Sequence, residues 1–185
     1  MREPCARLEI VVALLALTVA GAPASASTVT LTAVADAGLT GAKDSNTGTA
    51  TSMEVSSPQN RVVVRFDQAA IAAAANGLVL TSASLQLYVN TANHWGSGSA
   101  VDVHRLTVSW TESGVTWNCP IDTNTSNSLP DCAVQWAGGT FNAVPSATIL
   151  QTDSLVNQYE SFDVTADVAA FLNGTPNDEI GRAHV

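Results

Sequence analysis

The stretch that decides the fold is WTESGVTWNCPIDTNTSNSLPDCAVQWAGG, residues 110–139. It contains three of the four tryptophans and two of the three cysteines of the chain. Ser113 and Gly114 indicate a turn. The run between Cys119 and Cys132 is rich in Asn, Ser, Thr, Asp and Pro, which is typical of a surface loop. Such a loop is held in place when its ends are tied, and the two cysteines are positioned to tie them.

The first residues, 1–26, have the pattern of a secretory signal. A basic start precedes the apolar run 10–20, which is too short to cross a bilayer as a stop-transfer helix. The small residues at 24–26 match a cleavage site, so the sequence predicts a mature chain that begins at Ser27. A buried N-terminal helix is the alternative.

Export determines how the cysteines are interpreted. Cys5 lies in the signal segment, and the even pair that remains is Cys119 and Cys132. In an oxidising compartment this pair predicts a structural disulfide, worth about 3 kcal/mol for a loop of this length. A zinc site is the alternative, but it needs more soft ligands, and only His94 and His104 precede the last few residues.

Alternating apolar and polar residues predict strands along the remaining chain. The predicted strands cover residues 28–34, 61–67, 78–89, 101–106, 148–156 and 159–164. Two short helices are expected, one capped by Asp67 and ended by Asn76-Gly77, and one capped by Thr165.

Two polar stretches are expected to be loops. Residues 36–52 form a run dense in Gly, Asp, Asn and Thr, after which the chain is expected to re-enter the sheet at residues 53–56. Residues 90–100 are predicted to form a glycine- and serine-rich hairpin loop.

Composition limits the classes of protein and of partner. With 185 residues, 12% charged residues and an abundance of β-branched residues, the chain fits one globular domain rather than a disordered tail. Its net charge of −9 and pI near 4.4 argue against nucleic acid and anionic membranes as partners.

Several blocks of the sequence resemble one known family. WTESGVTWN with the preceding VDVHRL is similar to the signature of the DNRLRE-domain family, secreted modules related to carbohydrate-binding module family ninety-six. Three further blocks occur in the expected order, at residues 35–55, at 61–67 with 81–89, and at 162–177. The resemblance implies an all-β fold, a jelly-roll-type antiparallel β-sandwich with one or two short helices, over residues 27–178.

The last residues, 179–185 (EIGRAHV), depart from the family pattern. The family continues after TPN with strands that complete the sandwich, whereas this string is similar to one reading frame of a sequencing-adapter oligonucleotide. We therefore expect a non-native tail and a module whose closing strands are missing. A genuine divergent terminus is the alternative.

The loop at residues 90–100 provides the candidate ligand site. Trp95 can offer a flat face to a sugar ring, and His94 and Tyr88 are expected to lie near it. The alternative is that Trp95 folds back over the edge of the sandwich as a lid.

Four oxygen-bearing residues form a candidate metal site. Asp36, Asp44, Asn46 and Glu54 are donors of the kind that Ca²⁺ prefers, although their spacing does not match an EF-hand. Ordinary turn chemistry explains the same residues and is the alternative.

No catalytic motif is found: the sequence contains no G-x-S-x-G, no H-E-x-x-H and no glycine-rich phosphate loop. Together with the resemblance, this predicts a secreted, non-catalytic carbohydrate-binding module within a larger extracellular protein, with a polysaccharide as partner. The alternative is a structural or adhesive spacer domain without a glycan site.

Overall fold

The computed structural model describes the backbone of residues 6–13 and residues 26–41, 44–56 and 59–177 in full. Short strands make up most of the regular structure, with two helices. In chain order the elements are β1 (Ala6–Ala13), β2 (Ala26–Thr32), β3 (Ala35–Thr40), β4 (Asn60–Arg65), α1 (Gln68–Ala75), β5 (Val79–Val89), β6 (Ser99–Val103), β7 (Ala147–Gln151), β8 (Gln158–Asp163) and α2 (Thr165–Leu172). The prediction of an all-β fold with short helices is confirmed.

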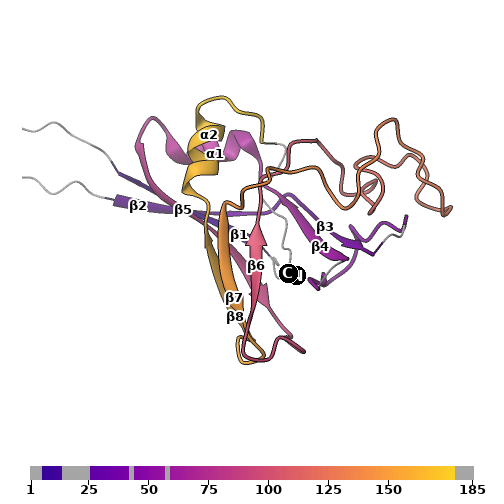
Figure 1. Cartoon of the computed structure of the whole chain (residues 1–185). Coiled ribbons are helices and arrows are strands. Elements are labelled where there is room, and N and C mark those ends of the chain that lie inside the picture. The colour runs from indigo at the N-terminus through magenta and orange to yellow at the C-terminus, as the bar shows by residue number, and fades with distance from the viewer. Residues whose placement is uncertain (1–5, 14–25, 42–43, 57–58, 178–185) are drawn as a thin grey trace, which may run out of the picture.

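The strands form three antiparallel sheets (Figure 1). The largest has the order β2-β1-β5-β8, and the others are the pairs β3-β4 and β6-β7. Helices α1 and α2 lie together at one end of these sheets. The arrangement is sandwich-like, and both the jelly-roll strand order and the missing closing strands remain predictions.

One core, the first core, fills the space between the sheets and the helices. On β4, Val62 and Val64 face this core, and on β5 Ala83 and Leu85 do, as the alternation in the sequence predicts. The other buried members are Phe66, Ile71, Val101, Val103, Phe162, Val164, Val168 and Phe171.

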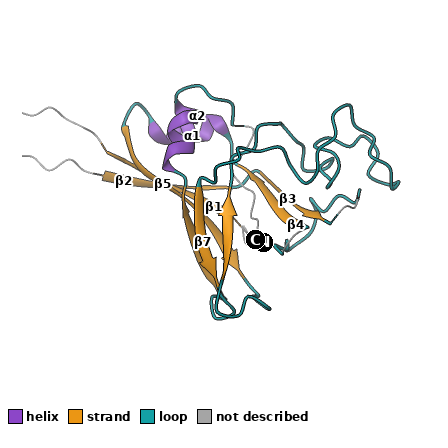
Figure 2. Cartoon of the chain, viewed as in Figure 1, coloured by secondary structure: helices purple, strands orange, loops and turns teal. Residues whose placement is uncertain are grey.

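The long connection between β6 and β7 builds the second core. It contains no helix or named strand, and it extends beyond β3 and β4 on the side away from β2 (Figures 1 and 2). Trp110 and Trp136 bury their side chains here against Val63 of β4. The remaining buried members are Ala35, Ala37, Leu39, Leu106 and Val115. Trp110 and Trp136 are therefore packing residues of this core.

The disulfide ties this connection as predicted. Cys119 and Cys132 are bonded, with their Cα atoms 5.9 Å apart. Cys119 is fully buried, and its backbone N–H donates to the Thr116 hydroxyl at 3.0 Å.

Two arginines of β4 hold the same connection against the sheet. Arg61 donates to the carbonyl oxygens of Ala137 and Gly138 at 3.0 and 2.7 Å, and its Cζ lies 4.6 Å from the centroid of the Trp117 ring. Partial burial lowers the pKa of Arg61 from its usual value. Arg65 donates to the Trp110 carbonyl at 2.8 Å.

The helix caps predicted from the sequence can be compared with those of α1 and α2. Asp67 accepts from the N–H of Ala70 at 2.9 Å and Asn76 ends α1 in a left-handed conformation, so both predicted caps of α1 are confirmed. The predicted cap at Thr165 is wrong. Thr165 begins α2, its hydroxyl accepts from the N–H of Ala83 at 2.9 Å, and its N–H donates to Asp163. The Thr165 hydroxyl and the Thr165 N–H both donate to the Asp163 carboxylate, and these hydrogen bonds lower the pKa of Asp163. The bond from the hydroxyl has the larger effect.

Three expectations about strands are wrong. Residues 35–40, most of them assigned to a polar loop, form β3, because small and apolar residues at alternate positions face the second core. Residues 53–56 form no strand, only a single bridge from Ser56 to Asn60. Residues 90–100 do not join a hairpin, since β5 already pairs with β1 and β8 on its two edges and β6 pairs with β7.

The predicted signal segment contains β1. This strand pairs with β2 on one edge and with β5 on the other. The predicted boundary at Ser27 therefore divides a sheet of the 185-residue chain, and cleavage there remains a prediction. The predicted tail at residues 179–185 lies outside the described residues.

A chain that begins at Ser27 lacks β1, so we expect the β5 amides that donate toward β1 to exchange faster with solvent than in the 185-residue chain. The exposed edge should also promote self-association. Hydrogen-exchange mass spectrometry and sedimentation of both chains measure this. Equal protection of residues 79–87 in the two chains would contradict the pairing.

The segment after β3 is fixed by Asn46 and by a close approach at Gly48. The Asn46 amide donates to the carbonyl oxygens of Glu112 and Val115 at 2.7 and 2.8 Å. A Cβ on Gly48 would lie 2.2 Å from the Glu112 carbonyl oxygen, which is backbone and has little freedom to move.

Gly48→Ala is therefore expected to lower the free energy of unfolding by about 2 kcal/mol or more through overpacking. Gly77→Ala is the control, because a Cβ there meets open space and only the left-handed backbone disfavours it. Chemical denaturation of both variants measures the difference, and an equal loss in the two would contradict the predicted clash.

Candidate functional site

A groove with a volume of about 1020 Å³ is lined on one side by the β3–β4 pair and on the other by the β6–β7 pair and the ends of β5 and β8. Its lining comes from five places. Those places are β3 with residues 47–56, Val62 of β4, the end of β5 with the loop that follows it, the β6–β7 pair, and β8. Segments far apart in the sequence therefore meet at one site.

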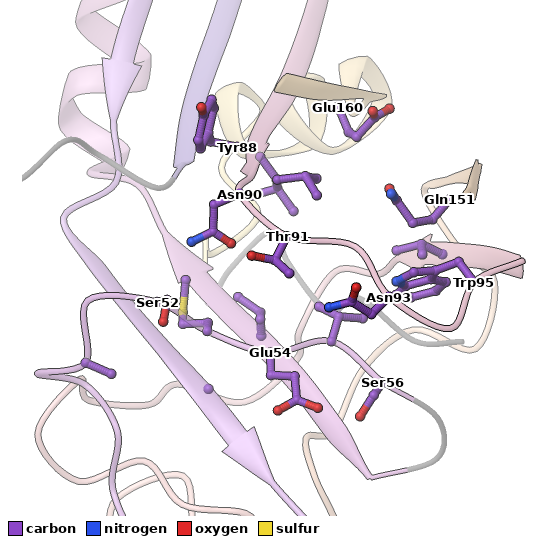
Figure 3. A pocket seen from close by; sticks show the side chains of 18 of the residues that line it. Ser52, Glu54, Ser56, Tyr88, Asn90, Thr91, Asn93, Trp95, Gln151 and Glu160 are labelled. Atoms are coloured by element: carbon purple, nitrogen blue, oxygen red, sulfur yellow. The ribbon is translucent and has the colours of Figure 1, made fainter. Parts of the chain in front are cut away.

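The groove has an apolar floor and polar walls. Val62, Val101 and Phe162 of the first core form part of the lining. Figure 3 shows Gln151 and Glu160 on one side and Ser52, Glu54 and Ser56 on the other, with Thr91, Asn93 and Trp95 between them. An apolar surface bordered by a few hydrogen-bonding groups is the usual character of a small-molecule site.

Trp95 lies in this groove in a fixed position. Its side chain is half-buried and packs against the first core. Its backbone N–H donates to one carboxylate oxygen of Asp153 at 2.8 Å, and the N–H of Gly96 donates to the other at 3.1 Å. The ring covers the edge of the core and also lines the groove, so the choice between a sugar platform and a lid remains a prediction.

Asp153 was not predicted as a site residue. It lies in the turn between β7 and β8, 58 residues from Trp95 in sequence, and no local pattern links the two. Charged oxygens bind backbone N–H groups more strongly than neutral ones do. The carboxylate of Asp153 therefore positions the loop that carries Trp95.

The other two predicted ligand residues have different surroundings. His94 is exposed next to Trp95, with a φ of 69°, and lines the groove. Tyr88 lies at the other end of the lining from Trp95 (Figure 3). Its ring packs edge-on against Tyr159, with the centroids 5.2 Å apart. The structure brings His94 to Trp95 and leaves Tyr88 apart from them.

The residues predicted to bind calcium are hydrogen-bonded within the protein, and two of them, Asp36 and Asn46, both bond to Glu112. Asp44 accepts from the Asn118 amide at 2.7 Å, and Glu54 accepts from the Asn60 amide at 3.0 Å. Asn46 is bonded to the backbone of the long connection, and the backbone N–H of Asp36 donates to Glu112 at 3.3 Å. Across the described parts of the chain, no three His, Cys, Asp or Glu side chains gather as metal ligands do. Calcium binding therefore remains a prediction that these contacts do not favour.

Glu160 is a further groove residue that the sequence analysis missed. Its register partner on β5 is Leu87, and the two residues after it lead to the buried Phe162. Glu160 thus occupies a core-facing position of β8 at the open end of the first core. The alternation of residues 158–163 could have revealed a carboxylate on this face, but not the groove that it borders.

Comparison with known proteins identifies the family of the chain. Among the described residues, no helix combines the length and the apolar character needed to cross a membrane. Neither the curated proteins nor the solved structures include a significant match to the chain. The family model for carbohydrate-binding module family 96 matches residues 27–137, which include β2 to β6 and most of the second core. The chain belongs to carbohydrate-binding module family 96.

Proposed function

We propose that this protein is a secreted, non-catalytic carbohydrate-binding module that holds a glycan in the groove against Trp95. Family membership supports the class of ligand. The observation that carries the location is the fixed position of Trp95 in a groove with an apolar floor and polar walls.

Trp95 and its neighbours have the chemistry that sugar binding requires. A pyranose ring has C–H faces that pack on an aromatic ring and hydroxyl edges that need hydrogen-bonding groups. The exposed Asn93 supplies a donor and an acceptor near Trp95, and the exposed Thr91 and Asn90 supply further ones along the groove (Figure 3). Because Asp153 holds the Trp95 loop before binding, little conformational entropy is lost when the ligand arrives.

A binding role without catalysis fits the remaining polar groups. His104 is buried, and its Nδ1 lies 2.8 Å from the carbonyl oxygen of Asn142, outside the groove lining.

Export follows from the predicted signal segment, and a larger extracellular parent protein is part of the same proposal.

Trp95→Ala is expected to weaken polysaccharide binding at least about tenfold, which corresponds to about 1.4 kcal/mol, because the glycan loses its aromatic surface. Affinity electrophoresis and calorimetry measure this loss. Leu129→Ala is the control, since Leu129 is an exposed apolar side chain outside the groove lining.

Equal binding by Trp95→Ala and Leu129→Ala would contradict the proposed site. No binding of any polymer by the folded wild type would instead favour a spacer domain. Incubation with each bound polymer should release no new reducing ends, and their appearance would contradict the non-catalytic role.

Asp153→Ala is expected to weaken binding several-fold while leaving the melting temperature nearly unchanged, because the exposed carboxylate positions only the Trp95 loop. Asp153→Asn keeps one acceptor oxygen and should fall between the wild type and Asp153→Ala. Calorimetric titration of the three proteins measures the series. Wild-type affinity in Asp153→Ala would show that the loop needs no such support.

A further inference from the structure

The β5–β8 pair has an outer face that the first core does not use. Leu85 of β5 is the register partner of Phe162 of β8, and both side chains are buried in the first core. Side chains alternate between the two faces of a sheet. Tyr88 and Tyr159, which are register partners three positions from that pair, therefore lie on the outer face.

The two tyrosines form an aromatic pair that solvent reaches. Their ring centroids lie 5.2 Å apart at an interplanar angle of 65°, which is an edge-to-face contact. Tyr88 is 44% exposed, and Tyr159 is half-buried. Tyr88 also borders the groove at the end away from Trp95, whereas Tyr159 is outside the groove lining. Because each ring packs against the other, both are positioned before a ligand binds.

Polar residues extend this face along both strands. Gln86 and Ser161 form the next register pair on the outer face, and Ser84 and Asp163 form the one after it. Ser161 and Asp163 are exposed, and Ser84 and Gln86 are half-buried. From residue 84 to residue 88 the strand covers about 14 Å, which is the length of a few linked sugar rings. The outer face thus offers aromatic rings for the C–H faces of sugars, and amide and hydroxyl groups for their hydroxyl edges.

Resting on the carbohydrate-binding class of the proposed function, we infer that the outer face of the β5–β8 pair is a second glycan-binding surface, which we call the tyrosine surface. Its residues are Ser84, Gln86, Tyr88, Tyr159 and Ser161. The register pair Leu87 and Glu160 lines the groove, so the two sites lie on opposite faces of the same two strands. A long polymer that contacts both sites gains affinity because its second contact is intramolecular, whereas a short oligosaccharide occupies one site at a time.

Polymer retention by variants tests the tyrosine surface. Affinity electrophoresis uses the polysaccharide that the wild type retains most strongly in a panel of neutral polymers and polyuronates. Tyr159→Ala is expected to raise the apparent Kd for this polymer at least about threefold, since the surface loses a ring that is outside the groove lining. Tyr159→Phe keeps the ring and should bind nearly as well as the wild type. Leu150→Ala is the control, because Leu150 is an exposed apolar side chain of β7 outside the groove lining.

The Trp95→Ala background separates the two sites. Trp95→Ala should keep residual retention on the polymer through the tyrosine surface, and Trp95→Ala combined with Tyr159→Ala should lose it. Melting temperatures of all variants are measured in parallel, because a cross-strand aromatic pair also stabilises a sheet. If Tyr159→Ala is unfolded at the assay temperature, Gln86→Ala takes its place, since it removes a hydrogen-bonding group from the same face and keeps both rings. A raised apparent Kd is again expected.

Two results overturn the inference and leave the proposed function standing. One is an apparent Kd of folded Tyr159→Ala, or of Gln86→Ala in its place, equal to that of Leu150→Ala. The other is complete loss of retention in Trp95→Ala alone. Retention on no polymer by the folded wild type overturns the proposed function and the inference with it.

Discussion

Strand β4 is the constraint on which the rest of the structure depends, because its two faces serve two different cores. Val62 and Val64 pack into the first core, and Val63 packs into the second. The arginines at its ends share the face of Val63 and bond to the long connection. One short strand thus joins the sheets to a connection that has no regular structure of its own.

Because each face of β4 packs into a different core, few aromatic and charged residues are left to bind a ligand. The tryptophans of residues 110–139 are used for packing and for stacking under Arg61, and the cations of β4 are used to hold the same connection. What remains at the open end of the first core is Trp95, a set of amides and hydroxyls, and carboxylates. The aromatic ring and the carboxylates of the candidate site are therefore residues that do not take part in the second core.

The sequence predicted local features better than their assembly. Sequence patterns predicted the alternation at β4 and β5 and the Asp67 cap, because each depends on neighbouring residues. They also predicted the disulfide, because only two cysteines follow the predicted signal segment. The β3 strand was missed because its core-facing residues are mostly small and alternate with Asp36, Gly38 and Thr40, which are typical of loops. The hairpin at residues 90–100 was wrong because strand pairing depends on which edges are free. Trp95 and His94 were recognised as a candidate pair, but the Asp153 contact joins residues too distant in sequence to be inferred from a pattern.

The most direct test of the account uses the four tryptophan indoles as reporters. In ¹⁵N-labelled protein titrated with an oligosaccharide of a polymer that the protein retains, the Trp95 indole resonance is expected to shift with ligand concentration. The indole resonances of Trp110 and Trp136, which are buried in the second core, should stay in place. Shifts confined to the tryptophans of residues 110–139, with Trp95 unaffected, would show that the glycan binds on the long connection and would contradict the groove.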